Sequence, residues 1–159
     1  MSLNTESTVE TDRVTVVVAT RNRLDRLRET IPRHRAPVIL VDNASDEPPT
    51  GLAGVDLLRL DANVGAAARN YGVARATTPY VAFADDDSYW EPGSLTLAAA
   101  LLDAHPRAAL LSARVLVGPA GRLDPVSAAQ SWGRAARPAV GIAPPSAAFP
   151  SRWNRPSND

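Results

Sequence analysis

Three adjacent carboxylates, Asp85-Asp86-Asp87, form the segment of this 159-residue chain with the most evident chemical use. They directly follow Tyr80–Ala84, an apolar run that predicts a buried strand. Neighbouring carboxylates repel one another, and a bound cation relieves that repulsion. Because side chains alternate along an extended backbone, Asp85 and Asp87 are expected to share one side. Oxygen ligands at this spacing suit Mn²⁺ or Mg²⁺, which take one or two carboxylates together with phosphate oxygens and water. We therefore favour a divalent-metal site over a solvated acidic turn.

Polar residues also follow three other apolar runs, each predicted to be a strand: Val14–Ala19, Val38–Val41 and the weaker Leu57–Leu60. The residues after these runs are, in order, Thr20-Arg21-Asn22, Asp42-Asn43 and Asp61-Ala62-Asn63. Asp and Asn favour turns for local reasons, so any one of these ends alone would say little. In a parallel α/β sheet, however, ligands bind beyond the carboxyl ends of the strands. We expect the four polar strand ends to meet at one edge and to form a site there.

The segment Asn63-Val64-Gly65-Ala66-Ala67-Ala68-Arg69-Asn70 begins a predicted helix that extends to Ala76. A helix N-terminus favours anions, and its small residues would let a ligand approach. Arg69 and Asn70 lie in the second turn, from which they can reach back to the strand ends. Close packing of the helix on the sheet explains the small residues equally well. The face predicted to pack carries Val64, Ala67, Ala68, Tyr71 and Ala74.

Strands that alternate with helices predict an α/β fold with a doubly wound, mostly parallel sheet and helices on both faces. The other predicted helices are Leu24–Ile31, closed by Pro32, and Ser94–His105. We expect a fifth strand at Ala109–Val117, followed by a turn within a hairpin to Leu123. Four segments result: a disordered N-terminus (1–12), the folded domain (13–118), a turn or hairpin region (119–131) and an atypical or disordered tail (132–159).

Composition excludes several classes of protein. The chain has no cysteine, so it has neither disulfides nor cysteine-ligated metal sites, and its formal net charge of zero gives no general attraction to nucleic acid. No apolar run approaches the length of a membrane span, and the polar start lacks a signal peptide, so we expect a cytoplasmic protein. We expect His34 and His105 each to be a surface histidine or one in the last turn of a helix, and neither is assigned a role. Tyr89-Trp90 either stack on a ligand or, as we prefer, pin their loop to the surface.

Four motifs in order make the stretch Val14–Leu95 resemble family 2 glycosyltransferases, which have the GT-A fold. The motifs are Val16-Val17-Val18-Ala19-Thr20-Arg21-Asn22-Arg23, Val38-Ile39-Leu40-Val41-Asp42-Asn43-Ala44-Ser45-Asp46, Asn63-Val64-Gly65 with Ala68-Arg69-Asn70, and Phe83-Ala84-Asp85-Asp86-Asp87. Each motif is moderately specific, and their order and spacing together are strongly specific. The resemblance covers about half of the chain clearly, and residues 13–118 would form its nucleotide-sugar-binding domain.

The resemblance implies binding of a nucleotide-diphosphate sugar of the UDP, GDP or dTDP type. Thr20, Arg21 and Asp42 match positions that hold the base and ribose, and Asp85 and Asp87 match the Asp-x-Asp signature that ligates Mn²⁺ or Mg²⁺. The implied donor-binding set consists of Thr20, Arg21, Asp42, Asn43, Asn63, Gly65, Arg69, Asn70, Asp85 and Asp86. Transfer to an acceptor hydroxyl would proceed with inversion, the hydroxyl being deprotonated by a carboxylate.

The sequence departs from the family pattern after this stretch. Members usually continue through an acceptor-binding half that carries the catalytic base, but after Asp124 this chain has only one further acidic residue, Asp159. No residue is assigned as the base, and we expect the donor-binding half with a tail altered by truncation or a change of reading frame. The main alternative is a catalytically incomplete nucleotide-binding module. A nucleotidyltransferase would need a glycine-rich loop after the first strand, and a phosphate-binding regulatory domain would leave the Asn63–Asn70 segment unexplained.

Overall fold

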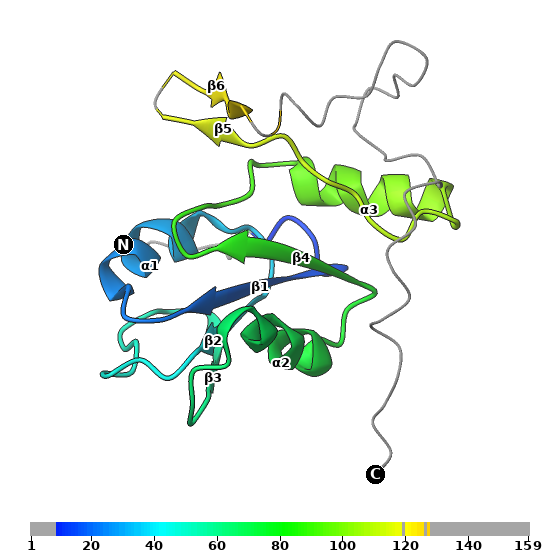
Figure 1. The fold of residues 1–159 in the computed structure, drawn as a ribbon. Coiled ribbons are helices and arrows are strands. Elements are labelled where there is room, and N and C mark those ends of the chain that lie inside the picture. The colour runs from blue at the N-terminus through cyan, green and yellow to red at the C-terminus, as the bar shows by residue number, and fades with distance from the viewer. Residues whose placement is uncertain (1–8, 119, 126, 128–159) are drawn as a thin grey trace, which may run out of the picture. The chain divides into compact units, whose positions relative to one another are not determined.

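The β-branched run that begins at Val14 forms an interior strand of a four-stranded parallel sheet (Figure 1). The structure, a computed structural model, describes residues 9–118, 120–125 and 127. The chain divides into two compact units, of which the first ends at Ala100. The strands of the first unit are β1 (Val14–Thr20), β2 (Val38–Asp42), β3 (Val55–Arg59) and β4 (Tyr80–Asp85), in the spatial order β3-β2-β1-β4.

The two interior strands are buried on both faces, as continuous runs of β-branched residues predict. The edge strand β4 is different: Ala84 is its only buried residue, and Phe83 is 47% exposed. The prediction of a buried strand before the acidic run was therefore wrong. Among the described residues β4 pairs only with β1, so one of its edges and part of its faces stay open.

Helices cover both faces of this sheet, which confirms the predicted α/β fold (Figure 1). On one face, α1 (Leu24–Thr30) and α3 (Ser94–Ala104) pack Leu27, Leu95 and Ala99 against the β1 residues Val16 and Val18. A short 3₁₀ helix, η1 (Ile31–Arg33), contains Pro32 and follows α1. On the other face, η2 (Gly65–Ala67) leads into α2 (Ala68–Arg75), which lies on β1 and β2.

The packed face of α2 is narrower than the sequence predicted. Of the five residues expected on that face, only Ala68 is buried, whereas Tyr71 is 49% exposed. The second buried position is Gly72, where a Cβ atom would overlap Val17 Cγ1 and lie 3.1 Å from Val41 Cγ2. The prediction failed because it ranked positions by apolar surface, while the close approach of helix and sheet selects the smallest side chains.

Glu10, near the start of the described part of the chain, is hydrogen-bonded to the beginning of α3. Its carboxylate accepts hydrogen bonds from the Gly93 amide at 2.5 Å and from the Thr96 hydroxyl at 3.0 Å. These bonds, led by that from the Gly93 amide, lower the pKa of Glu10. Residues 1–8, the rest of the predicted N-terminal segment, lie outside the described residues.

The second unit contains a small antiparallel hairpin, in which β5 (Leu116–Val117) pairs with β6 (Arg122–Leu123). This confirms the predicted hairpin to Leu123. The fifth strand predicted over Ala109–Val117 is wrong except for its last two residues. A strand requires a partner for its backbone groups, and β6 supplies one for two residues only. The predicted tail, 132–159, lies outside the described residues.

His34, expected at the surface or in the last turn of a helix, is the C-terminal cap residue of η1 and is half-buried. Neither ring nitrogen has a hydrogen-bond partner among the described residues, and burial lowers the pKa of this histidine. The folded state therefore disfavours the protonated ring. His105, by contrast, is exposed as predicted, and its Nδ1 lies 2.9 Å from the Leu101 carbonyl.

A pH dependence of stability follows from His34. The pKa of His34 is lower in the folded chain than the ordinary value of 6.5. Its contribution to the free energy of unfolding is therefore complete above pH 6.5 and is lost as the pH falls below that value. Because one proton is involved, the free energy of unfolding falls by at most about 1.4 kcal/mol for each pH unit. We expect urea unfolding midpoints to show this decline in the wild type and in His105→Gln. In His34→Phe the decline should be weaker, and an equal decline in all three proteins would exclude His34 as its source.

No helix in the part of the chain that the structure describes is long and apolar enough to cross a membrane.

Candidate functional site

The register of the parallel sheet brings the polar strand ends together. Thr20 at the end of β1 is level with Asp42 of β2, which in turn is level with Arg59 of β3. On the other side of β1, Ala19 is level with Asp85 of β4. The residues that follow these strands therefore share one edge, as the sequence predicted.

A pocket of about 470 Å³ opens at this edge. It is lined by residues from the ends of β1, β2 and β4 and from the start of η2 and α2: Ala19, Thr20, Arg21, Arg23, Asn43, Gly65, Ala66, Arg69, Asp85, Asp86 and Asp87. Three arginines thus face three aspartates. An anion and a cation can both find counter-charges here, as a metal-bound phosphate group requires.

Within the acidic turn, Asp86 is oriented differently from its neighbours. Its side chain is 13% exposed, whereas those of Asp85 and Asp87 are 69% and 58% exposed. Asp86 Oδ2 accepts a hydrogen bond from the Thr20 hydroxyl at 3.1 Å, and Oδ1 lies 3.3 Å from Arg23 Nη1. The middle carboxylate is therefore turned toward β1, while the other two remain available.

Arginines balance the charge of the acidic turn. Arg69, in the first turn of α2, lies 2.5 Å from Asp85 Oδ1. Arg23 lies 3.7 Å from Asp87 as well as close to Asp86. Arg21 is held by the loop after β2, where its Nε donates to the Ala44 carbonyl at 3.2 Å. The guanidinium groups are partly exposed, so they can exchange these partners for an anionic ligand.

Asn43 organises the loop before α2. Its Nδ2 donates to Asn63 Oδ1 at 2.8 Å and to the Gly65 carbonyl at 3.1 Å, and its Oδ1 accepts from the Val64 amide at 2.9 Å. Asn63 Oδ1 also accepts from the Gly65 amide. Gly65 has a φ of +60°, a conformation that favours glycine. Asn43 and Asn63 therefore use their amide groups to shape the rim of the pocket.

Asp42 is completely buried and does not line the pocket. Its Oδ1 accepts from the Ser45 amide at 3.0 Å, and its Oδ2 lies 3.6 Å from Arg59 Nη1. Oδ2 has no hydrogen-bond partner among the described residues. Arg59 also donates to the Ser45 carbonyl at 2.9 Å, so it fixes the loop after β2.

A second pocket of about 790 Å³ adjoins the first and shares Thr20 and Arg23 with it. It lies between α1 and the loop after β2 and includes Asn22 and Ser45. Asn22 has a φ of +58°, which asparagine tolerates better than most residues. The backbone N–H of Asn22 donates to Ser45 Oγ at 2.9 Å, and this hydrogen bond connects the loops after β1 and β2.

Two arginines at this edge, Arg23 and Arg59, were not predicted from the sequence to belong to the site. Arg23 stands inside the motif quoted for β1, and its position two residues after Arg21 was the available signal. Arg59 ends β3 and was assigned only to a weak strand. Asn70, which had been assigned to the site, is exposed on α2 and does not line either pocket.

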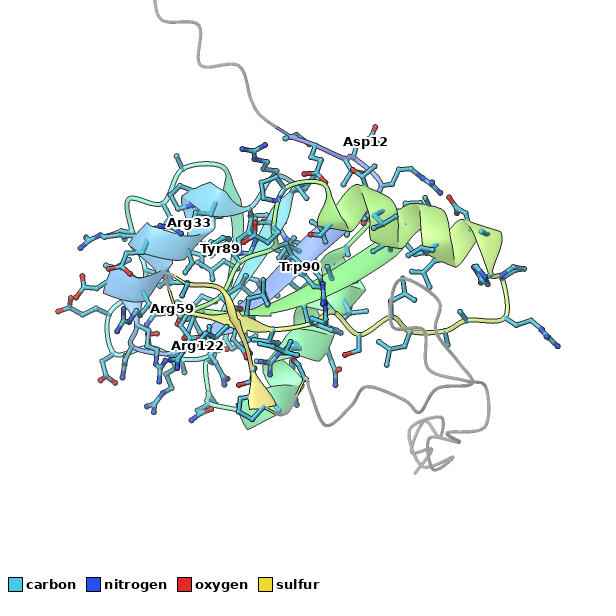
Figure 2. All side chains as sticks on the ribbon, turned by 90° about the horizontal axis from the view of Figure 1, so that it is seen from above. Asp12, Arg33, Arg59, Tyr89, Trp90 and Arg122 are labelled. Atoms are coloured by element: carbon cyan, nitrogen blue, oxygen red, sulfur yellow. The ribbon has the colours of Figure 1, made fainter. Side chains whose placement is uncertain are left out.

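Tyr89 and Trp90 hold the segment that follows the acidic turn. The guanidinium of Arg33 lies 4.6 Å from the centre of the Tyr89 ring (Figure 2). Trp90 packs against the core between the sheet, α1 and α3. Both contacts agree with the preferred prediction that these aromatic residues pin their loop.

The carboxylates present fit a metal that is held jointly with a ligand. Among the described residues no group of three or more acidic, histidine or cysteine side chains forms a complete metal site. Asp85 and Asp87 would supply two exposed carboxylates, and the other coordination positions would fall to phosphate oxygens and water. Mg²⁺ is commonly bound in this way, through one or two carboxylates and substrate phosphates.

Fold and site together define a parallel α/β protein with a polar pocket at the carboxyl ends of its strands. Residues 15–139 match the model of the family described as Glycosyl transferase family 2, and the chain therefore belongs to this family. The match includes the beginning of the segment 132–159, which was expected to show no family pattern. No curated protein matches the chain.

Solved structures agree with the fold. Residues 1–349 of S. aureus TarS in complex with UDP-GlcNAc are 24% identical, with a TM-score of 0.57 over 67% of this chain and 36% of that one. The mannosyltransferase PcManGT from Pyrobaculum calidifontis, in complex with GDP-Man and Mn²⁺, is 25% identical, with a TM-score of 0.50 over 66% of this chain and 36% of that one. This chain thus spans about a third of the length of these structures.

Proposed function

We propose that this chain binds a nucleotide-diphosphate sugar together with a divalent cation and provides the donor-binding part of an inverting glycosyltransferase. The observation that carries the proposal is the pocket that Arg21, Arg23 and Arg69 line together with the acidic turn, which Arg23 and Arg69 contact. Family membership and the nucleotide sugars named with the two solved structures support it.

In this proposal the parts of the donor are held by different groups. The diphosphate lies near Arg23 and Arg69, and the two exposed carboxylates, Asp85 and Asp87, hold Mn²⁺ or Mg²⁺. The base and ribose lie toward Thr20 and Arg21, beside the second pocket. Asp42 keeps its proposed place toward the nucleoside through the family resemblance alone, because its carboxylate is buried beside Arg59 and the Ser45 amide and lines neither pocket.

The proposed reaction forms a bond between an acceptor oxygen and the anomeric carbon while the bond from that carbon to the diphosphate breaks. The acceptor hydroxyl proton goes to a carboxylate base. A bound divalent cation would act as a Lewis acid that stabilises the leaving diphosphate. The arginines add charge-assisted hydrogen bonds to the same phosphates.

A second candidate is a nucleotide-sugar-binding module without catalytic activity of its own. It is favoured by the composition of the first pocket, whose lining carboxylates all belong to the Asp85–Asp87 turn. Two of these are assigned to the metal and one is turned toward Thr20 and Arg23. None of them is free to act as the base.

Two assays separate these candidates. Calorimetry with Mn²⁺ and UDP-, GDP- and dTDP-sugars tests binding, and release of nucleotide diphosphate during hydrolysis or transfer tests catalysis. The glycosyltransferase proposal predicts binding of at least one donor and metal-dependent release of its diphosphate. Binding without release would favour the module, and absence of binding to every nucleotide sugar would contradict both.

A further inference from the structure

The backbone of the acidic turn is attached to the end of α1. Thr30, the last residue of α1, is buried, and its hydroxyl lies 2.9 Å from the carbonyl oxygen of Asp86. The same hydroxyl lies 3.0 Å from the carbonyl of Arg26, one turn earlier in the helix. The contact with the Arg26 carbonyl is common for a threonine in a helix. The contact with the Asp86 carbonyl links residues that are 56 positions apart.

Asp86 is consequently held at three points. Its two carboxylate oxygens contact Thr20 and Arg23, and its backbone carbonyl accepts from Thr30. The neighbouring carboxylates pair with arginines, Asp85 with Arg69 and Asp87 with Arg23, and both are mostly exposed. Fixing the middle residue of three determines where the side chains before and after it project, because consecutive side chains leave an extended or turning backbone in different directions.

We propose that Thr30 is a positioning residue that directs Asp85 and Asp87 into the pocket by holding the backbone of Asp86. Thr30 lines neither pocket, so it touches no ligand bound there. The expected effect of Thr30 on ligand binding rests on the proposed function, whereas its effect on the conformation of the acidic turn does not. The Ser88 amide, which donates to the Asp85 carbonyl at 3.1 Å, reports the closure of this turn.

Thr30→Val removes the hydroxyl and keeps the shape of the side chain. Thr15→Val is a matched control, because Thr15 is also buried and donates or accepts one side-chain hydrogen bond, 2.8 Å from Thr78 Oγ1, near the opposite end of β1. Thr30→Ser retains the hydroxyl and serves as the conservative variant.

Hydrogen exchange in the ligand-free chain is the first measurement. We expect exchange of the Ser88 amide to be roughly 3- to 10-fold faster in Thr30→Val than in Thr15→Val, as the loss of one hydrogen bond implies. Thr30→Ser should match the wild type. Equal Ser88 exchange in the two valine variants, or an increase spread evenly over the whole chain, would overturn the proposal.

Affinity for a nucleotide diphosphate in the presence of Mn²⁺ is the second measurement. We expect Thr30→Val to weaken it roughly 3- to 10-fold while Thr15→Val leaves it unchanged. Affinity in Thr30→Val equal to that of the wild type would overturn the positioning role toward the ligand. If the wild type binds no nucleotide, the proposed function fails, and the exchange measurement still decides whether Thr30 holds the turn.

Discussion

Replacement of Asp87 with alanine is expected to weaken Mn²⁺-dependent binding of a nucleotide diphosphate by about 10- to 100-fold, the loss typical of a strong contact to a charged group. Asp87 is 58% exposed, and its contact with Arg23 is a long ion pair of 3.7 Å at the surface. Such pairs contribute little to stability. The free energy of unfolding should therefore change by less than about 0.5 kcal/mol.

The sign of the effect without metal makes this prediction sharper. When Mn²⁺ is removed with a chelator, Asp87 only repels the phosphates, so Asp87→Ala should bind the nucleotide at least as well as the wild type does. Glu29→Ala is a suitable control, because Glu29 is an exposed acidic residue on α1 that lines neither pocket. Unchanged Mn²⁺-dependent affinity in Asp87→Ala would remove Asp87 from the metal site.

Replacement of Gly72 with alanine is expected to destabilise the first unit by about 1–3 kcal/mol through overpacking. In an exposed helix the same change would stabilise by about 0.5–1 kcal/mol, because glycine is the poorer helix former. Here the added methyl group overlaps Val17 Cγ1 and lies 3.1 Å from Val41 Cγ2, and both valines are fully buried. The helix would have to move away from the sheet.

A double-mutant cycle tests this explanation. Val17→Ala on its own should destabilise by about 1–3 kcal/mol, because it leaves a cavity. In combination with Gly72→Ala it should cost less than the sum of the two single changes, since each relieves the other. Urea unfolding of the four proteins measures the coupling. Additive losses would show that the small residue at position 72 is not required by contact with Val17.

The two interior strands of the sheet were predictable because each is a continuous run of mostly β-branched residues. Val14–Ala19 and Val38–Val41 could hardly be anything but buried strands, and parallel pairing followed from the helices between them. Ala109–Val117 is also an apolar stretch, but within the described residues only its last two positions pair with another strand. Pairing is a property of the whole fold, so a local pattern cannot reveal its absence.

The position of the site was predictable because the carboxyl ends of parallel strands lie at one edge of the sheet. The contacts that each side chain makes there were not predictable. Asn43 and Asp86 have the residue types expected of ligand-binding groups, and both also make hydrogen bonds within the protein that hold the loops of the pocket. Thr30 gave no sequence signal, because its partner lies far along the chain. Spacing shows which residues reach an edge, whereas their partners depend on distances that only the structure supplies.

The central claim is that a divalent cation and a nucleotide diphosphate bind together at the acidic turn. Paramagnetic broadening of amide NMR signals by Mn²⁺, measured with UDP, GDP or dTDP present, tests it most directly. We predict that signals of Thr20, Gly65 and Ser88 broaden in a nucleotide-dependent manner, while those of Thr15 and Thr78, near the opposite end of β1, remain sharp. Broadening centred elsewhere, or no nucleotide-dependent broadening with any of the three, would contradict the claim.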